Sequence, residues 1–204
     1  MAMADQAAAK ETNRLETFAD GVFAIAITLL VLEIKIPDPR EDLGMALLAQ
    51  WPSFAAYVTS FLTIGVMWVS HHQMFTIIRR TTTTFLFLNV LFLLPVAFVP
   101  FPTALVASHI LEEGTRTTAV LVYGAVSVVI AVMFNVLWAY AFRNGLVVSG
   151  QGADRAQAVS RGFIVGPLIY LAATLLAFVN PFISMGVFAA LAVYWMLPGK
   201  IPSG

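Results

Sequence analysis

The sequence contains no cysteine among its 204 residues, and Asp, Glu, Lys and Arg together make up only 11% of it. The absence of cysteine excludes disulfides, thiolate metal sites and cysteine nucleophiles. A soluble domain usually has about 25% charged residues, whereas 60% of the residues here are hydrophobic. So few charges could not cover a water-soluble protein of this size, and no basic patch is large enough to indicate nucleic-acid binding. The composition therefore predicts a membrane protein.

Long stretches without Asp, Glu, Lys or Arg define the layout: 44–78, 81–111, 117–142 and 162–199, with a shorter one at 21–32. A helix needs about 20 mostly apolar residues to cross a bilayer. The stretch 162–199 is too long for one crossing, and Asn180-Pro181 divides it, because the residue before a proline is disfavoured in a helix. The sequence thus predicts an all-α membrane protein of one domain, 1–204, with six transmembrane helices at about 17–36, 50–78, 84–109, 117–142, 160–180 and 182–198.

Basic residues are distributed unevenly between the two sides of this plan. One side holds eight, namely Lys10, Arg14, Arg79, Arg80, Arg143, Arg155, Arg161 and Lys200, and the other holds Lys35, Arg40 and Arg116. The positive-inside rule then predicts that both termini are cytoplasmic. The first sixteen residues are polar and Ala-rich, so we expect no cleaved signal peptide and a multi-pass protein of the plasma membrane.

Acidic residues have the opposite bias. The outer side holds six, Glu33, Asp38, Glu41, Asp42, Glu112 and Glu113, against its three bases, which leaves a formal charge of −3. An acidic entrance raises the local concentration of cations. Ordinary solvated loops produce the same pattern, so both interpretations stay open.

A few polar side chains interrupt the predicted helices near their cytoplasmic ends. At about 1.5 Å per residue, Asp20, His71, His72 and Asn89 lie at similar depths, and Asn135 is about two turns from the same end. Buried polar groups in a membrane need partners, so we expect an inter-helix layer of Asp20, one of the two histidines and Asn89. Trp68 shares a helix face with both histidines. Asp20 also fits a second interpretation, an acid stabilised near a helix N-terminus.

The same residues give little support for a metal centre or an enzyme. Adjacent side chains on a helix point about 100° apart, so His71 and His72 do not readily face one metal ion. The third histidine, His109, is near the outer end of its helix. No metal-binding motif and no set of nucleophile, base and orienting group is recognisable. We expect no metal, no cofactor and no enzymatic activity.

One face of the first helix carries a regular stripe. Gly21, Ile25, Thr28 and Leu32 recur at spacings of four, three and four, with Leu29 beside them, so they share a helix face. From spacing alone, a packing stripe is the more common explanation and a pore-lining face is the alternative.

The segment Arg14-x-x-x-Phe18-Ala19-Asp20 opens the first helix. It resembles the Arg-x-x-x-Phe-Ser-Asp motif of the transmembrane protein 175 family, which includes the lysosomal potassium channel of animals and single-repeat prokaryotic relatives. Trp68-x-x-His71-His72 is also similar to that family, whereas Ala19 replaces the motif serine. The resemblance implies a potassium-selective channel in which four chains, embedded in lipid, surround a pore lined by the first helix. Like the family, the sequence lacks a Thr-Val-Gly-Tyr-Gly filter.

The resemblance also implies roles for individual residues. It assigns the pore constriction to Ile25, with Leu29 and Leu32 as further apolar rings, and potassium preference to Thr28. Such rings can gate and filter a pore by excluding water. Arg14, Phe18 and Asp20 are implied to form a scaffold for the helix, supported by the polar layer of Trp68, His71, His72 and Asn89.

Two other classes of membrane protein remain open at this point. One is a small proton-coupled secondary transporter that uses Asp20 with His71 or His72, and the other is a non-conducting scaffold. Transporters usually show internal repeats and charges at the midplane. The sequence has no clear repeat, and the predicted midplane is nearly free of charge.

Overall fold

The computed structural model describes residues 2–147 and 165–197, with side chains from residue 11 onward, and these are almost entirely helical. The first helix, α1 (Ala2–Leu29), tightens into the 3-10 turn η1 (Leu30–Glu33). The other elements are α2 (Leu43–Ala49), α3 (Trp51–Ile77), α4 (Thr83–Phe98), α5 (Pro100–His109), α6 (Arg116–Arg143), a helix from 165 that ends in η2 (Leu176–Phe178), and α8 (Pro181–Met196). Residues 160–164 of the predicted fifth helix, and Arg155, Arg161 and Lys200, lie outside the described residues.

Within the described residues, four segments are long and apolar enough to cross a membrane: Glu11–Glu33, Trp51–Ile77, Thr83–His109 and Arg116–Arg143. Two more apolar helices, Val165–Phe178 and Pro181–Met196, are shorter. The apolar helices agree with the predicted class, a membrane protein built from α-helices.

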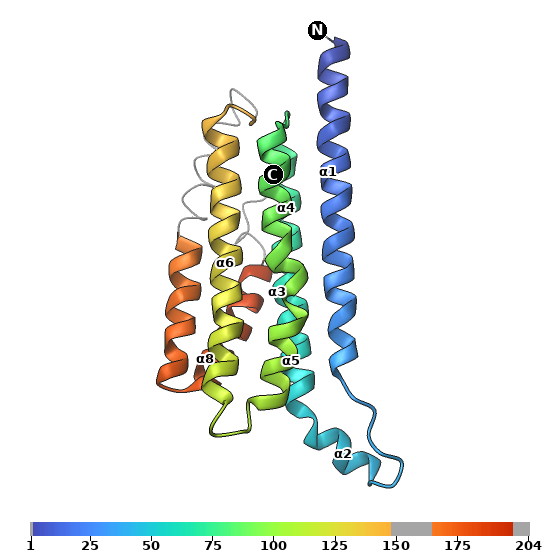
Figure 1. Cartoon of the computed structure of the whole chain (residues 1–204), viewed down its shortest axis with the longest axis vertical. Coiled ribbons are helices and arrows are strands. Elements are labelled where there is room, and N and C mark those ends of the chain that lie inside the picture. Colours follow the sequence, from blue (N-terminus) through green and yellow to red (C-terminus); the bar gives the residue numbers. More distant parts are fainter. Residues whose placement is uncertain (1, 148–164, 198–204) are drawn as a thin grey trace.

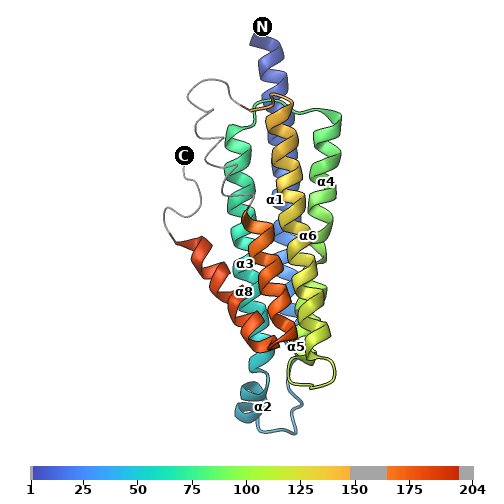
Figure 2. The same cartoon turned by 90° about the vertical axis from the view of Figure 1, so that its left-hand side faces the viewer.

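The first helix begins much earlier than the sequence predicts, at Ala2 instead of about residue 17. Its first three turns are rich in Ala with Gln, Lys and Glu, which are strong helix formers, so the helix extends beyond the apolar stretch. Figures 1 and 2 show this N-terminal part of α1 projecting past the ends of the other helices. At the other end the helix stops at Glu33 rather than 36, and Ile34 is already extended, with φ −85° and ψ 106°.

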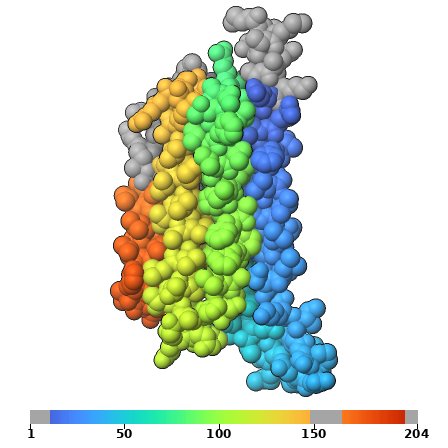
Figure 3. All heavy atoms as spheres, in the orientation of Figure 1, coloured from blue at the N-terminus to red at the C-terminus, as the bar shows by residue number. Residues whose placement is uncertain are grey.

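The predicted loop 37–49 contains a short helix, α2. The Asp42 carboxylate accepts a hydrogen bond from the backbone N–H of Met45 at 2.8 Å, which caps the first turn. A side-chain acceptor of this kind satisfies one of the free donors at a helix start. At seven residues, α2 is too short to give a periodic signal in the sequence. Figure 3 shows this segment protruding from the bundle at the end opposite the N-terminus.

The predicted helix 84–109 is divided into α4 and α5 at Val99. Pro100 and Pro102 have no backbone N–H and cannot donate to Val96 and Phe98, the carbonyls four residues before them. The N–H of Val99 instead bonds the carbonyl of Val96 at 3.1 Å, a tighter turn. The two pieces together still form one membrane-length apolar segment, Thr83–His109.

The division at Asn180-Pro181 lies where the sequence predicts it. The Asn180 side-chain oxygen accepts hydrogen bonds from the N–H groups of Phe182 and Ile183, at 2.9 and 3.2 Å. Pro181 occupies the first position of α8, where its missing N–H costs nothing.

The helices run side by side in an elongated bundle, with α1 at one edge (Figures 1 and 2). Helix α1 packs against α3 and α4, while α3 also contacts α5 and α8, and α6 contacts α4, α5 and α8. At the end where α1 begins, the N–H of Arg79 donates to the carbonyl of Leu146 at 2.8 Å, which joins the segments that follow α3 and α6.

An exposed helix face and its polar anchors

One face of α1 is buried against the bundle. Leu15, Ala19, Phe23, Ala26 and Leu30 recur every three or four residues, and all belong to the hydrophobic core shared with α3 and α4. Ala19, which stands in place of the motif serine, is fully buried on this face. The motif position therefore faces the core of the chain's own helices.

The opposite face of α1 is left uncovered by the chain's own helices. Ile25 is 61% exposed, and Gly21, Thr28 and Leu29 are also exposed, as is Leu32 (71%) in the turn η1 that continues α1. These are the residues of the predicted stripe. The hydroxyl of Thr28 donates to the backbone carbonyl of Ile25 at 2.9 Å, so its oxygen keeps lone pairs free to accept.

Arg14 and Phe18 extend the same stripe toward the N-terminal end of α1, since 14, 18, 21, 25, 28 and 32 follow spacings of four and three. Both side chains are exposed, Phe18 by 55%. In the single chain these two residues of the predicted scaffold lie outside the core, whereas Asp20 faces α3.

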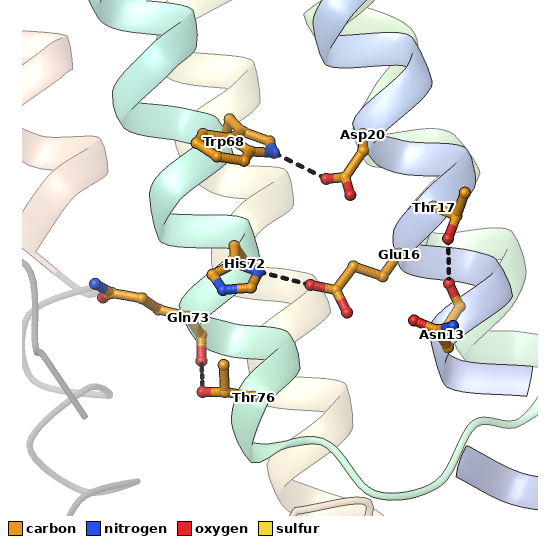
Figure 4. A network of polar contacts seen from close by, with 8 residues as sticks. All are labelled: Asn13, Glu16, Thr17, Asp20, Trp68, His72, Gln73 and Thr76. Carbon is orange, nitrogen blue, oxygen red and sulfur yellow. Dashed lines mark hydrogen bonds and ion pairs between the residues drawn. The ribbon is translucent and has the colours of Figure 1, made fainter. Parts of the chain in front are cut away.

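Two polar contacts fasten α1 to α3 (Figure 4). The indole N–H of Trp68 donates to the Asp20 carboxylate at 2.8 Å. One turn away, Nδ1 of His72 lies 2.7 Å from the carboxylate of Glu16. Asp20 and Glu16 are four residues apart, and so are Trp68 and His72, so each pair shares a helix face. The helices run antiparallel, and the two contacts fix their register.

His71 has a separate environment. It is fully buried, and its Nε2 lies 2.9 Å from the side-chain oxygen of Asn89 on α4. Its ring stacks on Phe75 and Phe92, with centroids 4.4 and 5.7 Å apart, and meets the edge of Phe23 on α1. The neighbouring histidines thus serve different partners, as their angular separation on the helix requires.

The predicted polar layer is therefore made of distinct pairs. Asp20 bonds Trp68, not one of the histidines or Asn89 as expected. His71 and Asn89 are brought together, while the side chain of Asn135 donates to the carbonyl of Ala131 on its own helix at 2.8 Å. Glu16 was missed by the sequence reasoning. Its position four residues before Asp20, matching His72 four residues after Trp68, was the signal available.

No group of three or more His, Asp or Glu side chains within residues 11–147 and 165–197 is arranged to hold a metal ion. The site consists of an exposed apolar helix face with one threonine, held from behind by hydrogen bonds. This arrangement suits a surface that meets other chains or lines a passage.

Comparison with known proteins identifies relatives of the whole chain. The family described as the endosomal/lysosomal potassium channel TMEM175 matches residues 14–100. A potassium channel of Chamaesiphon minutus is 45% identical over 193 residues, which cover 92% of this chain and 94% of the relative. A potassium channel of Streptomyces collinus is also 45% identical, covering 91% of both chains.

A solved structure agrees with these sequence matches. The crystal structure of a lysosomal potassium-selective channel TMEM175 homolog from Chamaesiphon minutus superposes with a TM-score of 0.83 at 43% identity, covering 91% of this chain and 96% of that chain. These relatives are ion channels, a class of proteins that are not enzymes. With nearly half of its residues identical to such relatives along nine tenths of its length, the chain belongs to the TMEM175 family.

Proposed function

We propose that the protein is a potassium-selective channel of the plasma membrane, formed by four copies around a central pore that α1 lines. The observation that carries this proposal is the exposed stripe of Gly21, Ile25, Thr28 and Leu32 on a helix whose other face is firmly packed. The relatives at 45% identity are named potassium channels.

A single stripe cannot enclose a pore, so several copies must close around an axis, and cyclic symmetry is the usual solution. Ile25, Leu29 and Leu32 of each copy would then form apolar rings. Water is unfavourable in a narrow apolar ring, so the ring blocks ions without any charge. Ile25 is the proposed constriction, and widening of these rings is the proposed gate and filter.

Thr28 lies one turn from Ile25 on the same stripe and is the polar residue closest to the proposed constriction. Because its hydroxyl hydrogen is engaged by the carbonyl of Ile25, four such oxygens would present lone pairs to the axis. Oxygen lone pairs can replace part of an ion's hydration shell. We therefore assign the preference for potassium to Thr28.

The polar contacts behind α1 would keep the stripe aimed at the axis. Asp20 and Glu16 bond Trp68 and His72, and the His71–Asn89 pair stacks beside Phe23. Arg14 and Phe18 complete the scaffold from the exposed face, where their partners would belong to the neighbouring copy.

We further propose that Val165–Phe178 and Pro181–Met196 complete a single domain of six transmembrane helices, with both termini cytoplasmic. Five basic residues belong to segments at the end of the bundle where α1 begins (Figure 1): Lys10 and Arg14 in α1, Arg79 and Arg80 after α3, and Arg143 at the end of α6. Three belong to segments at the other end: Lys35 and Arg40 after η1, and Arg116 at the start of α6. The excess of basic residues supports the cytoplasmic assignment of the first end.

Flux measurements on the purified protein in liposomes test this function. A channel gives a large, passive potassium current that follows the membrane potential. A slow, saturable flux coupled to protons would instead identify a transporter, and the absence of flux a scaffold. Either result would contradict the proposal.

A further inference from the structure

The short helix α2 is apolar on every side. Its seven residues carry no charged or polar side chain, and none of them is buried within the chain. Leu43 and Leu47 share one face, whereas Met45 and Leu48 lie on roughly the opposite face. Met45 is 68% exposed and Leu48 is 70% exposed. A helix that is hydrophobic all round is normally buried, so α2 needs a cover that the single chain does not provide.

The position of α2 limits what can cover it. The turn η1 ends at Glu33 and α3 begins at Trp51, so α2 connects the ends of two membrane-length segments. The exposed charged residues Arg40 and Glu41 come just before it, and the Asp42 carboxylate caps it. Figures 1 and 3 show this segment projecting at the edge of the bundle where α1 lies, on the side away from α6 and α8.

Lipid alone does not suit such a helix. A helix that lies at the membrane surface has an apolar face for the lipid and a strongly polar or charged face for water. Because α2 has no polar face, lipid on one side would leave either Leu43 and Leu47 or Met45 and Leu48 in water. A protein surface is therefore needed to cover the remaining side.

A second copy of the chain can provide that surface. In the proposed channel the exposed stripe of α1 faces the axis, so the neighbouring copies lie beyond the edge of the bundle that α1 forms. The segment containing α2 projects at this edge (Figure 3). The same end of the chain also has apolar side chains to receive a helix, because Val31 and Trp51 are half exposed and Ile36 is almost fully exposed.

We propose that α2 packs against the outer end of a neighbouring copy, so that four α2 helices form a collar around the outer end of the channel. Each copy then gives its α2 to one neighbour and receives the α2 of the other, as in any head-to-tail contact that closes into a ring. The collar joins the copies at the end opposite Arg14 and Phe18. This inference rests on the proposed assembly of four copies.

Photo-crosslinking tests the contact directly. Because the chain has no cysteine, a benzophenone group can be attached to a single cysteine, introduced by Leu48→Cys, and activated by light in liposomes of low protein density. If α2 contacts a neighbouring copy, a denaturing gel shows cross-linked dimers. Val129→Cys is the control, since Val129 is an exposed residue of the membrane-length helix α6, and it should give lipid adducts without dimers.

A charge in the proposed contact measures its contribution to assembly. Leu48 is exposed in the single chain, so Leu48→Lys leaves the chain's own core intact. In the collar it would bury a charge, which is costly, and we expect the protein concentration needed for assembly to rise about tenfold or more. Leu111→Lys is the matched control, a leucine 53% exposed between α5 and α6, and should leave assembly unchanged.

The possible outcomes separate the collar from the channel function. Dimers from Leu48→Cys, with weaker assembly of Leu48→Lys, would support the collar. If Leu48→Cys yields only lipid adducts in a protein that assembles and conducts potassium, the collar is wrong and the channel function stands. Assembly of Leu48→Lys equal to that of Leu111→Lys would also overturn the collar. An assembled protein that conducts no potassium but gives the dimers would overturn the channel function and keep the contact.

Discussion

At the scale of single residues, Asp20 anchors the exposed helix through the indole of Trp68. Asp20→Ala leaves the indole N–H without this acceptor, and a hydrogen bond to a charged group is worth about 1.5–3 kcal/mol. We expect a loss of stability of this size and a smaller assembled fraction, measured by heating in detergent followed by size-exclusion chromatography. Asp20→Asn keeps an acceptor oxygen and should lose less. If the Asp20→Ala protein resists heating as well as the unmodified protein, Asp20 does not anchor α1 through Trp68.

The polar residues themselves could be predicted from the sequence, but their pairing could not. Intramembrane Asp20, His71 and Asn89 stand out because polar groups are costly in a bilayer. Which of them meet depends on the rotation of α1 against α3, and that rotation is set by the packing of Phe23 and its neighbours in the core. The periodicity of one helix contains no information on its rotation against a neighbouring helix. The bond between Asp20 and Trp68 therefore could not be predicted from the sequence.

At the scale of the elements, one close helix contact depends on a missing side chain. A Cβ at Gly124 of α6 would lie 2.4 Å from the hydroxyl of Thr174 and 2.8 Å from its Cβ, closer than atoms can approach. We therefore expect Gly124→Ala to force α6 and the helix at 165–178 apart and to destabilise the protein by about 1–3 kcal/mol. The measurement is the unfolding temperature in detergent.

Gly186→Ala is the control for this contact. Gly186 lies in α8, and nothing is within 4 Å of the position of its Cβ. Replacing a helical glycine by alanine is favourable by roughly 0.5–1 kcal/mol where space allows. Equal effects of the two substitutions would mean that helix propensity, not the contact with Thr174, determines the result.

The long helices could be predicted because the bilayer thickness fixes their length and removes their charges. Bilayer thickness does not predict where a helix ends when helix propensity, a side-chain cap or a proline determines that end. α1 extends into a polar segment on helix propensity alone, α2 is held by the Asp42 cap, and α4 ends because Pro100 and Pro102 cannot continue its hydrogen bonds. These features are local, so they are visible in the sequence only when each cap and proline is considered individually.

At the scale of the whole molecule, the proposed orientation can be tested by labelling, since the chain has no cysteine. We introduce one cysteine at a time, Glu41→Cys on the proposed outer side and Thr83→Cys on the proposed inner side; both positions are exposed. A membrane-impermeant thiol reagent added to intact cells should label the first and spare the second. The reverse pattern would place both termini outside.

The proposed assembly of four chains can be tested by measuring the mass of the protein in detergent. The exposed stripe of α1 needs partners to enclose a pore, so we expect the detergent-solubilised protein to have the mass of four chains. A stable monomer that still conducts potassium after reconstitution would contradict the shared pore. The number of chains could not be derived from the sequence, because one stripe of a given width closes in rings of different size.

The central claim is that the stripe containing Ile25 faces a pore, and the most direct test is to make one residue of it polar. Val129 of α6 is the control, an apolar residue of comparable exposure near the middle of another membrane-length helix. If Ile25 faces the axis, Ile25→Asn wets the ring, whereas Val129→Asn only introduces a polar group on a surface facing lipid.

The measurement compares potassium and sodium currents of the unmodified protein, Ile25→Asn and Val129→Asn in liposomes at matched amounts of assembled protein. The account predicts that Ile25→Asn raises the basal current and lowers the potassium-to-sodium permeability ratio, while Val129→Asn changes neither. An assembled Ile25→Asn protein with the conductance and selectivity of the unmodified protein would show that this face of α1 does not line the pore.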